Sequence, residues 1–200
     1  IEYSEYFEKE AMELCVFKKI LIANRGEIAY RIIRTCHKLN IKTVAIYSAA
    51  DRNAFHVRMA DEAYFVPQTP SGQVGYLHGQ AILKIAKDAG VEAIHPGYGF
   101  LSENSQFARA CQKEGVIFIG PCAETIEVLG SKVQALELAK VCGVPTLPRT
   151  PLISGSMRDE EIRDIIDKLY TERRTTDCSW MVKPAAGGGG IGMESVHERQ

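Results

Sequence analysis

Short apolar runs alternate with amphipathic stretches along residues 17–121. Five apolar runs, which predict β-strands, occur at residues 19–23, 43–47, 63–66, 91–95 and 116–119. Apolar residues recur at helical spacing from residue 27 onward, over residues 76–89, and after Ser102, which we expect to cap the third of these helices. Strands that alternate with helices in this way predict an α/β fold in which a doubly wound parallel sheet is covered on both faces.

The pattern changes to helix after Pro121. Residues 123–129 and 131–142 predict two short helices, and a stretch containing proline and glycine at 148–155 precedes a third helix. A strand ending at Lys183, a glycine-rich turn and a second strand follow. We therefore expect an N-terminal extension (1–16), an α/β domain (17–121), a helical connection (122–148) and the start of an incomplete second domain (149–200).

The glycine-rich turn contains the first candidate binding site. Lys183 is followed by Gly187, Gly188, Gly189 and Gly190, and then by Gly192 and Met193. Residues without a Cβ let backbone N–H groups approach an anion closely, so this arrangement indicates a phosphate-binding loop. A flexible surface hairpin with a chance lysine is the alternative. The stretch matches neither common nucleotide-binding motif, because here the lysine precedes the glycines.

Two loops follow predicted strands at the sheet edge where ligands bind in such folds. For residues 24–27 a structural role is favoured over anion binding, because one glycine stands where the dinucleotide-binding motif needs three. Tyr98, Gly99 and Phe100 lie in the other loop, which can either line a pocket for a flat ligand or form a rigid turn with packed rings. We interpret His95, at the start of that loop, as a hydrogen-bonded structural residue.

Composition and charge narrow the class of protein. The chain has 200 residues and a formal net charge of −1, which offers no basic field for nucleic acid, and no apolar run approaches the length of a membrane span. Its six cysteines form no C-x-x-C pair, which indicates a reducing compartment and no cysteine metal site. We therefore expect a globular protein that binds neither nucleic acid nor a membrane.

Several motifs together resemble those of biotin carboxylase. They occur in order between about residues 17 and 197: KKILIANRGEIA at 18–29, ADEA at 60–63, HPGYGFLSEN at 95–104, FIGP at 118–121, GSK at 130–132, and the Lys183 strand with its glycine loop. The resemblance implies an ATP-grasp enzyme with a doubly wound N-terminal (pre-ATP-grasp) domain, a small lid and a large C-terminal domain. This chain would be the N-terminal portion of such an enzyme, in an acyl-CoA carboxylase or a pyruvate carboxylase.

The resemblance also implies a reaction and its site residues. The family uses ATP, bicarbonate and Mg²⁺ to carboxylate biotin held on a carrier domain. Lys132 and Lys183 correspond to ATP-binding lysines, and the glycine loop with Met193 corresponds to a lid over the nucleotide. Tyr98, Gly99 and Phe100 correspond to a loop near biotin. The ligands of Mg²⁺ and the groups that handle bicarbonate are expected beyond Gln200, so no catalytic or metal-ligating residue is assigned in this chain.

The implied partners are a biotin carboxyl carrier domain, a carboxyltransferase and further copies of the same chain, which would meet through the N-terminal and C-terminal domains. The implied compartment is the cytoplasm, or the mitochondrial matrix in a eukaryote. Which acyl-CoA or keto acid finally receives the carboxyl group is not encoded in these motifs, because that choice belongs to the carboxyltransferase.

Ile191 departs from the family pattern, because an arginine or lysine usually stands at this place in the glycine loop. The change removes a cation that would meet phosphate. It motivates a competing hypothesis, a non-catalytic nucleotide-binding or assembly remnant of the family. A dinucleotide-dependent oxidoreductase is a third hypothesis, which rests on the alternating pattern alone and is opposed by the lone Gly26.

Overall fold

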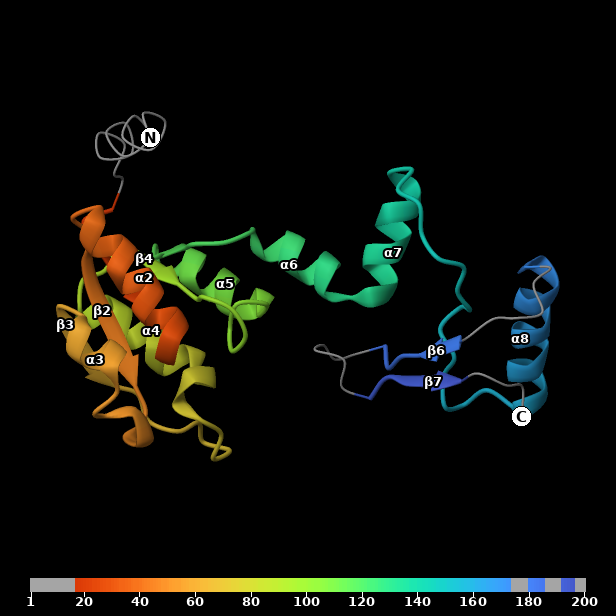
Figure 1. Cartoon of the computed structure of the whole chain (residues 1–200), viewed down its shortest axis with the longest axis horizontal. Helices are drawn as coiled ribbons and strands as arrows, with labels where there is room; N and C mark the ends of the chain where they lie inside the picture. Colours follow the sequence, from red (N-terminus) through yellow and green to blue (C-terminus); the bar gives the residue numbers. More distant parts are fainter. Residues whose placement is uncertain (1–16, 174–179, 186–191, 197–200) are drawn as a thin grey trace. The chain divides into compact units, whose positions relative to one another are not determined.

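The computed structural model describes residues 17–173, 180–185 and 192–196 (Figure 1). The chain divides into two compact units, Ile1–Glu127 and Val128–Gln200. The four-part division expected from the sequence is finer than these units and stays a prediction. Over the described part of the chain, no helix combines the length and the apolar character needed to cross a bilayer.

A parallel sheet forms the first unit. Its strands are β1 (Lys19–Ile22), β2 (Lys42–Tyr47), β3 (Glu62–Phe65), β4 (Ala93–His95) and β5 (Ile117–Phe118). They lie in the order β3-β2-β1-β4-β5, and every neighbouring pair is parallel. The chain thus winds outward from β1 in one direction and then in the other, which confirms the predicted doubly wound α/β fold.

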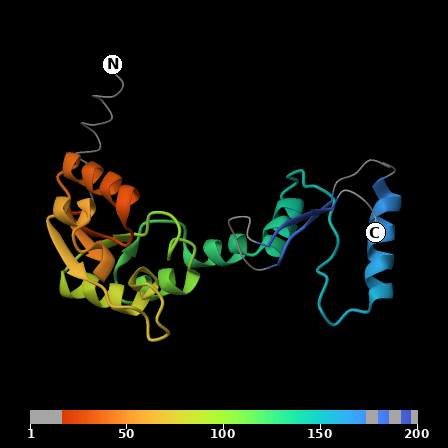
Figure 2. The same ribbon diagram turned by 60° about the horizontal axis from the view of Figure 1, so that its bottom comes forward.

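Helices and single turns connect the strands. They are α2 (Gly26–Lys38), α3 (Phe55–Met59), α4 (Gly79–Asp88), α5 (Ser105–Lys113) and the 3-10 turns η1 (Ala49–Asp51) and η2 (Gly75–Leu77), and α6 (Ala123–Gly130) follows β5. In Figure 2 the red-orange α2 and the yellow-green α4 lie on opposite sides of the sheet. The sheet is therefore the middle of three layers.

Successive residues of β1 face opposite layers of the core. Leu21 packs in one buried cluster with the apolar faces of α4 and α5, whereas Ile20 and Ile22 pack in another cluster with α2. Side chains alternate between the faces of a strand, and both faces of this one are covered. This is why β1 reads in the sequence as an uninterrupted apolar run.

Two predicted helix starts are wrong. The N-cap of α5 is Asn104, whose side chain accepts a hydrogen bond from the Phe107 N–H at 2.8 Å, and not Ser102. The Ser102 N–H instead donates to the Gly99 carbonyl, so Ser102 belongs to the turn before the helix. Tyr76 lies in η2, and α4 begins only at Gly79.

The described residues of the second unit include two paired strands and two helices. Its elements are α7 (Lys132–Val141), α8 (Asp159–Arg173), β6 (Trp180–Val182) and β7 (Glu194–Val196). β6 and β7 pair antiparallel, with Trp180 opposite Val196, which confirms the two predicted strands, whereas residues 186–191 between them lie outside the described part of the chain. Val141 is 83% exposed and Leu147 is 82% exposed, so much of this unit's apolar surface is not covered by its own described residues.

We expect Ile94→Ala to lower the free energy of unfolding by about 3 kcal/mol, because a truncated core side chain loses its burial and leaves a cavity. Ile94 is 0% exposed in β4. The same substitution at Ile117, which is 52% exposed in the neighbouring β5, should cost less than about 1 kcal/mol. Urea denaturation followed by far-ultraviolet circular dichroism measures both changes. Equal losses would contradict the assignment of the core.

Candidate functional site

The loops after β1 and β4 lie side by side, because these two strands are neighbours in the sheet with Ile22 opposite His95. Together they form an open hollow of about 420 Å³ at the carboxyl edge of the sheet. Its lining consists of Asn24, Arg25, Gly26, Glu27, Ile28, Tyr98, Gly99 and Phe100. The structure therefore gathers both candidate loops into one place, where ligands bind in open α/β sheets.

Asn24 joins the two loops. It is only 2% exposed, and its side-chain N–H groups donate to the Pro96 carbonyl at 2.8 Å and to the Tyr98 carbonyl at 2.7 Å. A Cβ on Gly97 would lie 2.7 Å from the Asn24 amide nitrogen, and Gly97 has a φ of +65°, so this close approach requires glycine. The favoured structural role of residues 24–27 is thus confirmed, as a contact between loops.

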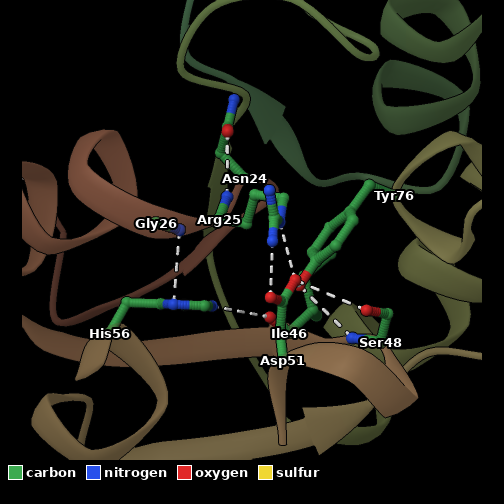
Figure 3. A network of polar contacts seen from close by, with 8 residues as sticks. All are labelled: Asn24, Arg25, Gly26, Ile46, Ser48, Asp51, His56 and Tyr76. Atoms are coloured by element: carbon green, nitrogen blue, oxygen red, sulfur yellow. Dashed lines mark hydrogen bonds and ion pairs between the residues drawn. The ribbon is translucent and has the colours of Figure 1, made fainter. Parts of the chain in front are cut away.

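Arg25 binds a different segment. Its Nε and Nη2 donate to the two oxygens of Asp51 at 2.6 Å each, and the Tyr76 hydroxyl donates to the same carboxylate at 2.7 Å (Figure 3). Hydrogen bonds from Arg25 lower the pKa of Asp51 to about 2 despite the opposing effect of burial. Burial, with a further contribution from Asp51, raises the pKa of Tyr76 to about 12. The carboxylate therefore stays ionised and the phenol stays protonated at neutral pH.

Gly26 holds a third segment through His56 of α3. The Gly26 N–H donates to Nδ1 of His56 at 3.3 Å, and the other ring nitrogen, Nε2, lies 3.4 Å from the Ile46 carbonyl (Figure 3). Since Nδ1 must accept and Nε2 must donate, the imidazole is neutral. Burial lowers the pKa of His56, in agreement with that state. His56 is 1% exposed and serves the packing of α3 on the loop.

Tyr98, Gly99 and Phe100 form one wall of the hollow. Tyr98 is 64% exposed. Phe100 has a φ of +41°, a left-handed conformation that is strained for a residue with a side chain, and its ring stacks on the Tyr76 ring with centroids 5.1 Å apart. The sequence left open whether these rings are packed or line a pocket. Phe100 is 36% exposed but stacks on Tyr76, whereas the Tyr98 ring is mostly exposed.

His95 is a structural residue, as predicted. Its Nδ1 accepts a hydrogen bond from the Gly97 N–H at 3.0 Å, which shapes the start of the loop. Burial lowers the pKa of His95, so the ring is neutral at neutral pH.

The predicted ATP-binding residues belong to the second unit. Lys132 is the first residue of α7, and the side chain of the preceding Ser131 caps the helix by accepting a hydrogen bond from the Gln134 N–H at 3.3 Å. Lys183 follows β6 and is exposed, and beyond the turn Met193 is 44% exposed beside Gly192, which has a φ of +73°. Gly187, Gly188, Gly189, Gly190 and Ile191 lie outside the described residues. The ATP-site assignments stay predictions.

No pattern in the sequence singled out Asp51, His56 or Tyr76. Arg25 and Asp51 are 26 positions apart, and η1 and α3 are too short to show a hydrophobic period. Within residues 17–173, 180–185 and 192–196 no group of three histidine, cysteine, aspartate or glutamate side chains could hold a metal ion.

Comparisons with known proteins agree on one family. The sequence profile described as "Biotin carboxylase, N-terminal domain" matches residues 16–126. The biotin carboxylase of Halalkalibacterium halodurans is 51% identical over 181 residues, which cover 90% of this chain and 38% of that protein. The mitochondrial methylcrotonoyl-CoA carboxylase subunit alpha of Dictyostelium discoideum is 44% identical over 182 residues, which cover 91% of this chain and 25% of that protein.

A solved structure has the same fold. It is the biotin carboxylase domain dimer of 2-oxoglutarate carboxylase from Hydrogenobacter thermophilus, in complex with MgADP, ADP and bicarbonate. This chain matches it with a TM-score of 0.74 and 43% identity, over 90% of this chain and 38% of that one. The chain thus spans less than two fifths of the proteins it resembles.

We expect Asp51→Asn to lower the free energy of unfolding by about 2 kcal/mol at neutral pH, because Arg25 and Tyr76 lose a charged acceptor. The folded-state pKa of Asp51 is about 2 against an ordinary 3.8, so its stabilisation is present above about pH 4 and is lost as the pH falls toward 2. The difference between wild type and variant in urea denaturation should therefore shrink over that range.

Asp88→Asn is the matched control. Asp88 forms an ion pair with Lys84 on the surface, where the side chain of Asp88 is 58% exposed and that of Lys84 is 75% exposed. This variant should therefore change the free energy of unfolding by less than about 0.5 kcal/mol. The stabilising role of the Arg25–Asp51 pair would be contradicted if Asp51→Asn lowered the free energy of unfolding no more than Asp88→Asn does. A loss that did not depend on pH would contradict it as well.

Proposed function

Because the chain belongs to the family of the biotin carboxylase N-terminal domain, we propose that it is the N-terminal portion of a working biotin carboxylase. In this proposal the complete protein uses ATP and bicarbonate, with Mg²⁺, to carboxylate biotin on a carrier domain. The observation that carries it is the 51% identity to a bacterial biotin carboxylase over 90% of this chain. The bound MgADP and bicarbonate of the solved relative support the choice of cofactors.

Lys132 and Lys183 are proposed to bind the phosphates of ATP. Lys183 is exposed at the end of a strand, next to the glycine-rich turn. Lys132 stands at the N-terminus of α7, where the helix macrodipole disfavours a cation but favours an anion, so a bound phosphate would relieve the conflict. Backbone N–H groups of Gly187 to Gly190, Gly192 and Met193 would add donors that close over the nucleotide.

Tyr98, Gly99 and Phe100 are proposed to lie near biotin. The exposed Tyr98 ring offers an apolar face beside the 420 Å³ hollow, which suits a flat, weakly polar ring system. Mg²⁺ supplies charge neutralisation at the phosphates when it is bound, and its ligands are proposed to come from sequence beyond Gln200. We therefore assign neither a metal ligand nor a catalytic residue to this chain.

The partners and the compartment are also proposals. A biotin carboxyl carrier domain and a carboxyltransferase follow from the family's chemistry, and the dimeric state of the solved relative supports a homo-oligomer. The mitochondrial relative supports a mitochondrial matrix location in a eukaryote, and the cytoplasm is the alternative for a bacterium. The division into extension (1–16), α/β domain (17–121), helical connection (122–148) and the start of a lid domain (149–200) is proposed on the same basis.

The complete protein should hydrolyse ATP in a reaction that requires both bicarbonate and biotin. Steady-state phosphate release, measured with each component left out in turn, checks this. Hydrolysis that needs neither component would contradict the proposal. Tight ATP binding without turnover would instead favour the non-catalytic alternative that Ile191 motivates.

Within that assay, Lys132→Gln and Lys183→Gln should each raise the KM for ATP about tenfold or more, because a charge-assisted hydrogen bond to phosphate is lost. Lys140→Gln is the control, because Lys140 is exposed in the last turn of the same α7. It should leave the KM for ATP within about twofold of wild type, as expected for a surface residue away from a site. Equal effects at all three lysines would refute the assignment.

A further inference from the structure

Tyr76 connects the loop of the hollow to the polar network beneath it. Its hydroxyl donates to Asp51, and one face of its ring stacks on Phe100 at an interplanar angle of 30°. The Arg25 guanidinium lies 5.9 Å from the centroid of the same ring. Tyr76 is 2% exposed, so it does not form part of the surface that a ligand can reach.

We infer that Tyr76 and Asp51 are positioning residues for the Tyr98–Phe100 loop, and that they set the affinity for biotin without touching it. The inference rests on the proposed function in one respect, that this loop lies near biotin. Asp51 holds the Tyr76 hydroxyl in place through a hydrogen bond, as Figure 3 shows. The Tyr76 ring in turn holds Phe100 in place through ring stacking.

The loop needs such a support because its backbone is strained. Phe100 has a φ of +41°, and both Gly97 and Gly99 have a φ of +65°. Glycine adopts this conformation freely, whereas a phenylalanine does so only at an energetic cost that surrounding contacts must offset. The stacking on Tyr76 is a contact of this kind. Without it, Phe100 can relax to a negative φ.

That relaxation would move Tyr98. Asn24 anchors the loop on one side through the carbonyls of Pro96 and Tyr98, and Phe100 anchors it on the other side of Gly99. The carbonyl of Gly99 accepts a hydrogen bond from the Ser102 N–H at 2.8 Å, so a change in the φ of Phe100 moves Gly99 relative to Ser102 and disturbs this bond. Releasing Phe100 therefore alters the placement of the Tyr98 ring against the hollow, and displacements of this kind weaken ligand binding.

The test uses the complete protein with Tyr76→Phe and Tyr76→Leu. The leucine variant loses both the hydroxyl and the ring, and it should raise the KM for free biotin about tenfold while the KM for ATP stays within about twofold. The phenylalanine variant keeps the stacked ring and should raise the KM for biotin by about threefold. Amide hydrogen exchange at residues 98–101 should be faster in the same order, and exchange at Ile33, which packs in the buried cluster that does not contain Tyr76, should not change.

Tyr64→Phe is the matched control. Tyr64 also donates its hydroxyl to a carboxylate, that of Glu62 at 2.9 Å, but it lies in β3. Removing the Tyr64 hydroxyl should change neither the KM for biotin nor the KM for ATP. It should also leave the amide hydrogen exchange of residues 98–101 unchanged.

Three outcomes would overturn the inference: a KM for biotin that stays within about twofold of wild type in both Tyr76 variants, parallel rises in both KM values, or unchanged exchange at residues 98–101. If the leucine variant does not fold, the phenylalanine variant decides by the same criteria. A wild-type protein without biotin-dependent turnover would refute the proposed function, and hydrogen exchange would still decide the positioning role.

Discussion

The carboxylate of Asp51 is the interaction on which the geometry of the site depends. It accepts two hydrogen bonds from Arg25 and one from Tyr76 in a setting where its side chain is only 10% exposed. A carboxylate buried to this degree is costly unless its lone pairs are used, and here Arg25 and Tyr76 use them, together with the nearby Ser48 hydroxyl at 3.4 Å. Because Arg25 belongs to the β1–α2 loop and Tyr76 to η2, one anion joins segments that are far apart in the sequence.

The loop after β1 holds several segments of the first unit together. Asn24, Arg25 and Gly26 are consecutive, yet they bind three different segments: the loop after β4, η1 and α3. The parallel pairing of β1 with β4 places the first two loops within reach of each other. The fold therefore produces a hollow with a rigid floor and one strained aromatic wall, an arrangement that can hold a flat ligand in a fixed orientation.

The sequence predicted the layers of the fold better than its polar contacts. The apolar run of β1 has the length and the unbroken apolar character of a buried strand, and β6 and β7 were predicted on either side of a glycine-rich stretch, so these strands were predicted correctly. The placement of Asp51 against Arg25 depends on how the chain crosses the sheet, which no local pattern encodes. The cap of α5 was missed for a different reason, because Asn104 and Ser102 are both good cap residues and only the register of the helix distinguishes them. Lys132 and Lys183 were singled out by resemblance, since an exposed lysine has no distinctive surroundings in a sequence.

The proposed function is that the complete protein attaches carbon dioxide to biotin. The most direct test is to supply the complete protein with isotopically labelled bicarbonate, ATP, Mg²⁺ and free biotin, and to measure label in the biotin fraction. Label that accumulates only when ATP is present is the result we predict. Bound ATP without any label in biotin would contradict the claim.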